Sequence, residues 1–395
     1  MTMTFHRPTL ALDMAEQLLR PKGLQVSVRS GLFLGGLRRI GKTTFLRGDL
    51  VPALENLGAI VVYVDLWSNT NAKPTDLLLA EVRKKLAELQ SADSRALGLL
   101  KRVKGLDLGA AGFKLGFSVS DVGKPDGVTL ADVFTALVEL GRTDVVVIVD
   151  EVQHALGSED GHAMLLALKA ARDAINTRPN PPGHFLFLGT GSHRARVREL
   201  TIKGNQAFNG ALSQDFPLLD EDFVKWLLAE SALGRREPSL MAAFESFQRL
   251  GRRPEELMKA LLALQGVPDG QDPDADLRAI TEAIRQSAAA LDLARLDQLS
   301  PLAQAVFGRV VRSGGSGVRR VFSEATLEEY GKELGRTVTL DEVQPAANAL
   351  LDANLLVRDG HGVYGVSDPF VAEAYQSRLA VQLKLAGDDP AGPEV

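Results

Sequence analysis

A run of small, basic and hydroxyl residues at positions 36–44, Gly-Leu-Arg-Arg-Ile-Gly-Lys-Thr-Thr, has the residue types and spacing that can hold phosphate groups. Glycines at Gly36 and Gly41 let the backbone turn so that successive N–H groups point at an anion, aided by the positive end of a following helix. Lys42 can reach the outer phosphates of a nucleotide, and the Thr43 hydroxyl can ligate Mg²⁺. The run therefore predicts binding of a nucleoside triphosphate, and an ordinary glycine-rich turn is the competing interpretation.

A second group of chemically active residues follows the apolar run at 145–149, Val-Val-Val-Ile-Val, which ends in Asp150 and Glu151. A carboxylate at the end of a buried strand can hold Mg²⁺, usually through water, and the next carboxylate can orient or deprotonate an attacking water. We therefore expect Asp150 to be the metal residue and Glu151 the catalytic base. The alternative is a strand that ends at a polar surface turn, and the preceding phosphate-loop pattern makes it the weaker one.

A third apolar run, at 184–189, ends in the small polar residues Gly-Thr-Gly-Ser at 189–192. Thr190 or Ser192 can contact the γ-phosphate or the attacking water, and we expect Ser192 to have this role. Strands often end in such residues, so this signal has little weight without the other two.

These three groups must be positioned by alternating strands and helices. Apolar runs typical of buried strands occur at 31–34, 59–65, 144–149 and 184–189, and helical periodicity occurs at 5–20, 76–89 and 130–140. The alternation predicts an α/β core with a mostly parallel sheet over residues 1–215, with ligands at the carboxyl ends of its strands. A glycine-rich, alternating stretch near 106–128 predicts an inserted hairpin.

Beyond residue 215 the strand patterns stop, and helical periodicity over 216–294 predicts an α-helical lid. Within it, Gly-Arg-Arg-Pro at 251–254 opens a helix, with proline at a favourable first-turn position. Arg252 and Arg253 are candidates for phosphate contacts from the lid, and two solvated arginines are an equally weighted alternative.

The C-terminal part, 295–385, has three helical patterns followed by two short strands, which is winged-helix order, and 386–395 is a tail. Thr339 and Glu342 have the spacing of a capping box at the start of the third helix. That helix would enter a DNA groove, yet the sequence from Thr339 to Asn354 contains neither Lys nor Arg. From residue 295 to the end there are ten Lys and Arg against fourteen Asp and Glu, so 10 − 14 = −4. Phosphate contacts dominate DNA affinity, so this module is expected to bind DNA poorly.

The composition excludes several classes of protein. A net charge of −5 gives no general attraction to nucleic acid or to an anionic membrane, and the absence of Cys excludes disulfides and thiolate metal sites. No apolar run approaches the length of a membrane span, and the six His are scattered without the spacing of metal ligands. The expected location is the cytoplasm.

Taken together, these motifs resemble the archaeal-ATPase-like branch of the STAND class of AAA+ P-loop ATPases. The likeness rests on the double arginine inside the phosphate loop, the Asp-Glu pair, the Gly-Thr-Gly-Ser strand end, Gly-Arg-Arg-Pro and the terminal winged helix. It implies an α/β P-loop NTPase core with a parallel sheet, followed by an α-helical lid and a C-terminal winged-helix domain. It also implies ATP as the nucleotide, and a nucleotide state that switches assembly or partner binding.

One departure from this family concerns the arginine finger. Relatives carry a Gly-Arg pair shortly before the lid, whereas this sequence has Phe-Asn-Gly-Ala at 208–211. Arg194, Arg196 and Arg198 lie upstream and are candidate substitutes. An arginine finger contributes roughly 10³–10⁵ to the hydrolysis rate, so we expect slow turnover or an arginine from another subunit.

The sequence thus predicts a slow, Mg²⁺-dependent ATPase that acts as a molecular switch, with a homo-oligomer or a protein as its partner. The residues expected to contact nucleotide are Gly36, Arg38, Arg39, Gly41, Lys42, Thr43, Thr44, Arg252 and Arg253, with Lys42, Glu151 and Ser192 catalytic and Thr43 and Asp150 on the metal. Two alternatives remain: an ATP-dependent DNA-binding regulator or loader that uses the winged helix, and a non-hydrolysing ATP sensor.

Overall fold

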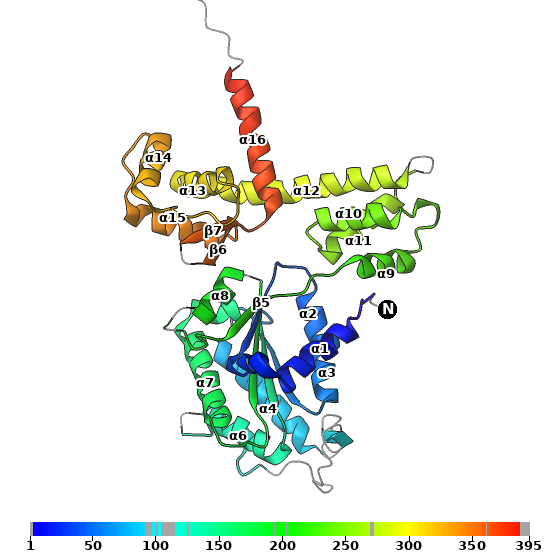
Figure 1. The fold of residues 1–395 in the computed structure, drawn as a ribbon, viewed down its shortest axis with the longest axis vertical. Helices are drawn as coiled ribbons and strands as arrows, with labels where there is room; N and C mark the ends of the chain where they lie inside the picture. Colours follow the sequence, from blue (N-terminus) through cyan, green and yellow to red (C-terminus); the bar gives the residue numbers. More distant parts are fainter. Residues whose placement is uncertain are drawn as a thin grey trace, which may run out of the picture. The chain divides into compact units, whose positions relative to one another are not determined.

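The computed structural model describes residues 3–91, 97–98, 102–103, 115–124, 126–192, 194–202, 204, 206–268, 272–360 and 362–387. The chain forms two compact units, Met1–Leu218 and Leu219–Val395 (Figure 1). The first unit ends close to residue 215, where the sequence predicts the end of the core. Within the described ranges, no helix has both the length and the apolarity needed to cross a membrane.

The first unit alternates helices and strands along most of its length. Its elements are α1 (Pro8–Leu19), η1 (Gly23–Ser30), β1 (Leu32–Gly35), α2 (Lys42–Phe45), η2 (Leu46–Leu50), α3 (Val51–Asn56), β2 (Ile60–Asp65), α4 (Pro74–Gln90), η3 (Val119–Asp121), α6 (Leu130–Gly141), β3 (Val145–Asp150), η4 (Val152–Gly157), α7 (Glu159–Asn176), β4 (Phe185–Gly191), α8 (Arg194–Ile202) and β5 (Leu212–Asp215).

In the described part of this unit, five parallel strands form one sheet in the order β2-β3-β4-β1-β5. Strand β4 lies between β1 and β3, so the carboxyl ends of these three strands are neighbours. Each of the three chemically active groups predicted from the sequence follows one of these strands. The parallel sheet of the predicted α/β fold is therefore confirmed, and its topology brings the three groups to one edge.

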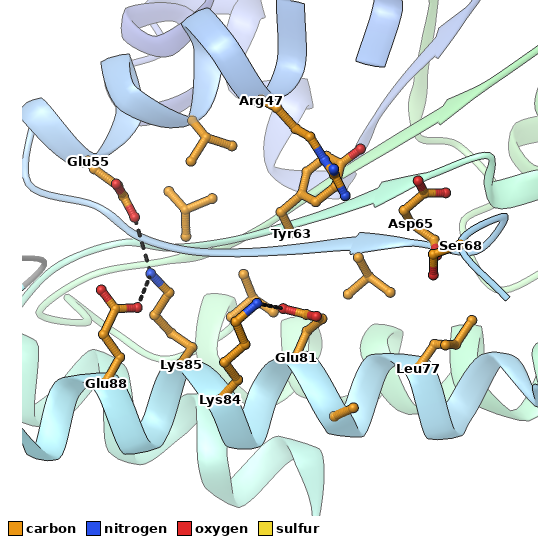
Figure 2. A pocket seen from close by; sticks show the side chains of 15 residues that line it. Arg47, Glu55, Tyr63, Asp65, Ser68, Leu77, Glu81, Lys84, Lys85 and Glu88 are labelled. Atoms are coloured by element: carbon orange, nitrogen blue, oxygen red, sulfur yellow. Dashed lines mark hydrogen bonds and ion pairs between the residues drawn. The ribbon is translucent and has the colours of Figure 1, made fainter. Parts of the chain in front are cut away.

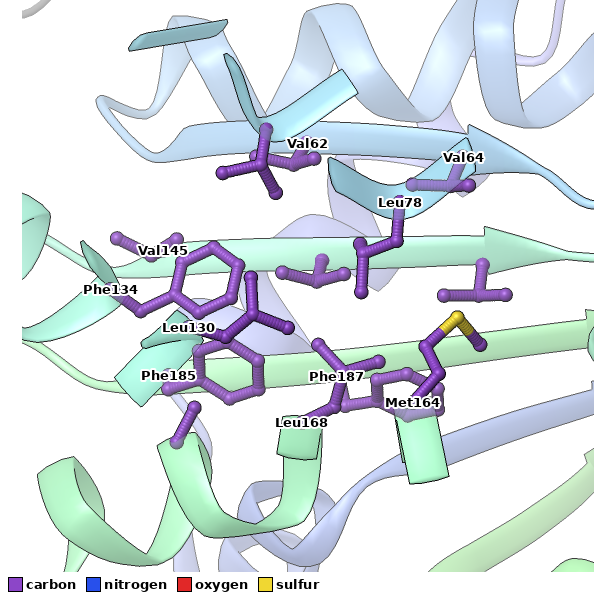
Figure 3. Close-up of a cluster of buried hydrophobic side chains, with 14 of the residues drawn as sticks. Val62, Val64, Leu78, Leu130, Phe134, Val145, Met164, Leu168, Phe185 and Phe187 are labelled. Atoms are coloured by element: carbon purple, nitrogen blue, oxygen red, sulfur yellow. The ribbon is translucent and has the colours of Figure 1, made fainter. Parts of the chain in front are cut away.

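The strands are buried on both faces, as their continuous apolar sequences predict. In β3, Val145, Val147 and Val149 pack in a hydrophobic cluster with residues of α4, α6 and α7 (Figure 3). Val146 and Ile148 belong to the cluster on the opposite face, with residues of α1 and α3. Because helices cover both faces, the strands are held rigidly and their polar carboxyl ends have fixed positions.

The hairpin predicted near 106–128 lies partly outside the described residues, and the described part does not form one. From residue 115 onward this stretch contains η3 and an isolated parallel bridge between Val122 and Val128. Val122 is buried in the first hydrophobic cluster, and its carbonyl accepts a hydrogen bond from Arg83 of α4 at 2.6 Å. The segment is therefore held by a helix, which its alternating sequence does not reveal.

The second unit is mostly helical. Its elements are α9 (Glu221–Ser231), η5 (Gly234–Arg236), α10 (Leu240–Arg249), α11 (Pro254–Gln265), α12 (Pro273–Asp297), α13 (Pro301–Arg312), α14 (Glu324–Leu334), α15 (Leu340–Asp352), β6 (Leu356–Gly360), β7 (Val363–Val366) and α16 (Pro369–Gly387).

The C-terminal part of this unit has winged-helix order, as predicted. Helices α13, α14 and α15 are followed by the antiparallel pair β6–β7, and an isolated bridge joins Val318 to Tyr364 of β7. The capping box at the start of α15 is present, because the backbone N–H of Thr339 donates to Glu342 Oε2 at 2.9 Å. The short polar signal in the sequence thus correctly marked the start of this helix.

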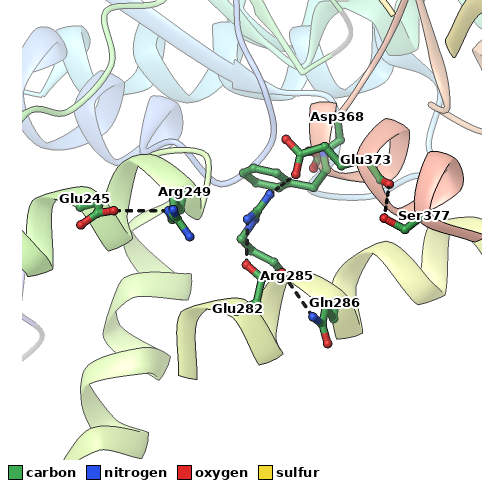
Figure 4. Close-up of polar contacts among 9 residues, drawn as sticks. Glu245, Arg249, Glu282, Arg285, Gln286, Asp368, Glu373 and Ser377 are labelled. Carbon is green, nitrogen blue, oxygen red and sulfur yellow. Dashed lines mark hydrogen bonds and ion pairs between the residues drawn. The ribbon is translucent and has the colours of Figure 1, made fainter. Parts of the chain in front are cut away.

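Helix α12 joins the predicted lid to the winged helix without a break. It runs through residue 294, where the sequence divides the two, and its last turns contribute Leu293 and Leu296 to the C-terminal hydrophobic cluster. Arg285 on α12 donates to Glu373 of α16 at 2.5 Å and stacks over Phe370, 4.2 Å from the ring centroid (Figure 4). The boundary at 294 stays a prediction, as does the tail at 386–395, which lies largely outside the described residues.

Burial of tyrosines predicts an alkaline weakening of the second unit. Burial raises the pKa of Tyr330 and Tyr375 above the ordinary value of about 10, so the unfolded chain loses these protons first as pH rises. The contribution of the two protonated tyrosines to the free energy of unfolding is fully present below about pH 10. Above that pH it falls, by at most about 1.4 kcal/mol per pH unit for each tyrosine. We expect the free energy of unfolding in urea to fall between about pH 10 and about pH 11, and to fall less steeply in Tyr330→Phe. An unchanged slope in that variant would contradict this explanation.

Candidate functional site

The predicted phosphate loop connects β1 to α2 and needs both of its glycines. Gly41, at the N-cap of α2, has φ of +88°, a conformation that favours glycine. At Gly36, an added Cβ would lie 2.7 Å from Ile40 Cδ1 and 3.2 Å from Phe216 Cβ. Helix α2 continues directly into η2 and α3, so the loop precedes a helical stretch that extends to Asn56. The strand–loop–helix context that the motif requires is therefore present.

Lys42 is buried within this loop, with 5% of its surface exposed. Its Nζ donates to the carbonyl oxygens of Gly36 at 2.9 Å and Leu37 at 2.7 Å. The loop therefore holds an ammonium group at its centre, and two of its contacts are carbonyl oxygens of the loop itself. A phosphate oxygen carries a full charge and accepts a stronger hydrogen bond than a carbonyl, so an incoming phosphate group would attract this ammonium.

Asp150, at the end of β3, is the most densely bonded carboxylate of the site and is 1% exposed. Its Oδ2 accepts from Thr43 Oγ1 at 2.7 Å and from the Tyr63 hydroxyl at 2.8 Å. Its Oδ1 accepts from Thr190 Oγ1 and from the backbone N–H of Glu151 at 3.0 Å. The structure thus brings together the two predicted metal residues, Thr43 at the start of α2 and Asp150 at the end of β3.

The sequence pattern gave no role to Tyr63. It appears there as one residue of a buried strand at 59–65, and the only signal is a hydroxyl in an otherwise apolar run. Burial, and next the charge of Asp150, raise the pKa of Tyr63, so its hydroxyl stays protonated and donates throughout the neutral range. Thr190, which the sequence offered as a phosphate contact, is fully buried and donates to Asp150, the predicted metal residue.

Glu151 and Ser192, the predicted base and the predicted phosphate contact, are in direct contact. Glu151 Oε2 accepts from Ser192 Oγ at 2.8 Å and from Ser192 N at 3.2 Å. The same oxygen accepts from Gln153 Nε2, a residue that the sequence did not single out, and Gln153 also donates to Ser192 Oγ at 3.2 Å. Glu151 has φ of +55°, in the left-handed region, which turns its side chain back toward β4.

The loop arginines lie on the exposed side of the site. Arg38 Nε donates to Ser192 Oγ at 3.4 Å, and its guanidinium lies 4.6 Å from the ring centroid of Trp67. Arg39 and Thr44 are also exposed, and Arg39 has φ of +65°. Arg38 is thus brought to the group around Ser192, whereas contacts of all three residues with nucleotide stay predictions.

The two lid arginines contact other groups of the second unit. Arg252 donates to the Leu219 carbonyl oxygen at 3.2 Å, and Arg253 Nη2 forms an ion pair with Asp368 Oδ2 at 2.5 Å. The Arg253 ion pair connects the start of α11 to the residue before α16. The phosphate contacts predicted for Arg252 and Arg253 remain predictions.

The oxygen ligands present suit a magnesium ion that arrives with phosphates. Thr43 supplies one hydroxyl and Asp150 one carboxylate, and the two side chains are in contact in space. Among the described residues there is no group of three or more His, Cys, Asp or Glu that could hold a metal ion. Mg²⁺ bound with a nucleotide takes one or two protein oxygens, and phosphates and water complete its shell. The side chains therefore fit this metal without forming a cage of their own.

Solved structures share this fold. The chain is similar to the Walker-type ATPase of Pyrococcus abyssi, with a TM-score of 0.52 and 19% identity, and the match covers 93% of this chain and 99% of that one. It is also similar to the ORC2 protein of Aeropyrum pernix in its ADP form, with a TM-score of 0.54, 14% identity and coverage of 98% and 97%. The sequence itself matches no family model and no curated protein. The chain therefore shares the fold of these structures: a P-loop core with a parallel sheet, a helical lid and a C-terminal winged helix.

Proposed function

We propose that this protein is an ATP-binding, slowly hydrolysing AAA+ ATPase of the STAND type, whose nucleotide state controls oligomerisation or partner binding. The observation that carries the proposal is the convergence of Lys42, Thr43, Asp150, Glu151 and Ser192 at the carboxyl ends of three adjacent strands. Each residue type is the one that phosphoryl transfer to water needs at that position. The resemblance of the motifs, and a fold shared with a protein solved in an ADP form, favour adenine as the base.

The residues divide the work as follows. Lys42 binds the β- and γ-phosphates in place of the carbonyl oxygens that it now contacts, and Thr43 and Asp150 hold Mg²⁺. When bound, Mg²⁺ neutralises charge on the phosphate oxygens. Glu151 orients the attacking water and takes its proton, and Ser192 positions Glu151 and reports on the γ-phosphate.

Slow turnover follows from two features of the first unit. The stretch 208–211 lacks the arginine that relatives carry there, and that group contributes roughly 10³–10⁵ to the rate. Glu151 accepts hydrogen bonds from both Ser192 and Gln153 and must rearrange to meet a water. The missing cation comes either from Arg194, Arg196 or Arg198 on α8 or from a second subunit.

ATP hydrolysis measured together with size-exclusion light scattering tests this proposal. We expect Mg²⁺-dependent turnover that rises more than linearly with protein concentration, alongside assembly that requires ATP, because the cation is then supplied by another subunit. Turnover strictly proportional to protein concentration in a monomer would remove assembly from the proposal. Failure to bind ATP would overturn it entirely.

A non-hydrolysing ATP sensor is the second candidate. The restraint of Glu151 by Ser192 and Gln153, together with Asn-Gly at 209–210 in place of an arginine, favours it. Under this hypothesis the protein binds ATP without hydrolysing it and later releases it unchanged. Multiple turnover that Glu151→Gln abolishes would exclude it.

The DNA-binding alternative rests on the winged helix alone. Helix α15, in the position of a recognition helix, has Asp341 and Glu342 in its first turn and contains no basic residue. Arg319 and Arg320 are exposed nearby in sequence, but two charges supply little of the phosphate contact that DNA affinity needs. Anisotropy titration of duplex DNA at modest salt, with and without ATP, decides this: ATP-dependent binding would favour a loader over a protein-directed switch.

A further inference from the structure

Strand β2 is one of the two edge strands of the sheet, and Tyr63 lies in the middle of this strand. Among the described residues no other strand pairs with its outer side. A groove of about 470 Å³ runs along this edge between η2 and α3 on one side and α4 on the other, and Tyr63 is one of its lining residues (Figure 2). The guanidinium of Arg47 lies over the Tyr63 ring, 4.7 Å from its centroid.

The hydroxyl of the same tyrosine reaches the metal residue. It donates to Asp150 Oδ2 at 2.8 Å, and Thr43 donates to that same oxygen at 2.7 Å. The opposite oxygen, Oδ1, is held by Thr190 and by the backbone N–H of Glu151. Both oxygens of the Asp150 carboxylate therefore accept hydrogen bonds. Of the two donors to Oδ2, Thr43 is a predicted metal ligand and Tyr63 is not.

We propose that Tyr63, clamped by Arg47, is a positioning residue that orients Asp150 for Mg²⁺, and the proposal rests on the function proposed above. If the Thr43 hydroxyl oxygen ligated Mg²⁺, the Tyr63 hydroxyl would still hold Oδ2 and fix the Asp150 carboxylate on that side. Hydrogen bonds to a ligating carboxylate set its orientation, and their loss typically costs 10–100-fold in metal affinity or activity. The Arg47 guanidinium stacks over the Tyr63 ring and limits the positions that the ring can take.

Among the described residues, Asp150 is the hydrogen-bond partner of the Tyr63 hydroxyl. The Tyr63 ring lies on the face of β2 toward η2, next to Val61 in the groove. Phenylalanine at this position keeps the ring and its stacking on Arg47 and removes only the hydroxyl. The variant therefore isolates the hydrogen bond from the packing.

The test is a magnesium titration of Tyr63→Phe with two readouts, binding of a fluorescent ATP analogue and ATP hydrolysis. We expect the half-saturating concentration of free Mg²⁺ to rise by about tenfold in both, within the usual range for such partners. Affinity for the nucleotide in excess EDTA should stay unchanged, because no metal is then involved. Tyr330→Phe, which removes a buried hydroxyl bonded to the Val321 carbonyl in the second unit, is the matched control and should leave the magnesium dependence unchanged.

Arg47→Gln is the second variant, and we expect it to shift the magnesium dependence in the same direction by a smaller factor. A magnesium dependence in Tyr63→Phe equal to that of the wild type would overturn the proposal. Equal losses of nucleotide affinity with Mg²⁺ and with EDTA would overturn it as well, since they would reveal a general structural role. If the wild-type protein bound no nucleotide, the proposed function would fail, and that result is distinct from an unchanged Tyr63→Phe.

Discussion

Lys42→Ala is expected to lose nucleotide affinity by at least about a hundredfold, measured by titration of a fluorescent ATP analogue. The ammonium of Lys42 is already buried at the centre of the phosphate loop, bonded to the carbonyl oxygens of Gly36 and Leu37. Two hydrogen bonds to charged phosphate oxygens contribute roughly 1.5 kcal/mol or more each, and about 2.8 kcal/mol corresponds to a hundredfold in affinity. Alanine supplies neither the bonds nor the charge.

Lys85→Ala is the matched control for this change. Lys85 lies on α4 in the same unit and forms ion pairs with Glu55 and Glu88 at 3.2 and 2.9 Å, away from the phosphate loop. The control should bind nucleotide as the wild type does. Unchanged affinity in Lys42→Ala, with the protein folded by circular dichroism, would mean that the glycine-rich loop is not a nucleotide site.

Glu151→Gln has the second large effect that we expect, and the effect falls on turnover. A positioned general base contributes typically 10²–10⁴-fold to the rate, so hydrolysis should fall by about that factor. ATP affinity should be retained, because the proposed nucleotide contacts of the loop do not include Glu151. Glutamine keeps an oxygen that can accept from Ser192 Oγ, so the local hydrogen bonding survives while the basicity is lost.

Single-turnover and steady-state rates, together with equilibrium binding, separate these effects. Glu139→Gln is the control, since Glu139 is a partly exposed carboxylate paired with Arg178 at 3.1 Å on the same unit. Equal turnover in Glu151→Gln and in the wild type would assign the base to another residue. If the wild type shows no turnover but binds ATP, the sensor hypothesis becomes the better account.

Much of this protein follows from its sequence by itself. The phosphate-loop pattern, the Asp-Glu pair after an apolar strand and the capping box at Thr339 are local signals, because each depends on residues a few positions apart. Short continuous apolar runs between helical patterns predicted the parallel sheet. A strand buried on both faces has apolar residues at successive positions and does not alternate apolar with polar residues. The winged-helix order was also predicted from local patterns: three segments with helical periodicity, followed by two short strands.

The tertiary structure decided which side chains meet. Thr43 and Asp150 are 107 positions apart and touch because the parallel strands β1 and β3 end at the same edge of the sheet, where α2 begins. Tyr63 reaches Asp150 only because β2 pairs in register beside β3, and no local pattern records that pairing. The hairpin that the sequence predicts near 106–128 lies partly outside the described residues; within the described part, Val122 is buried and its carbonyl oxygen accepts a hydrogen bond from Arg83. Contacts between distant segments depend on how the elements pack. The periodicity of a sequence shows which face of a helix or strand is buried, but it does not show which other element covers that face.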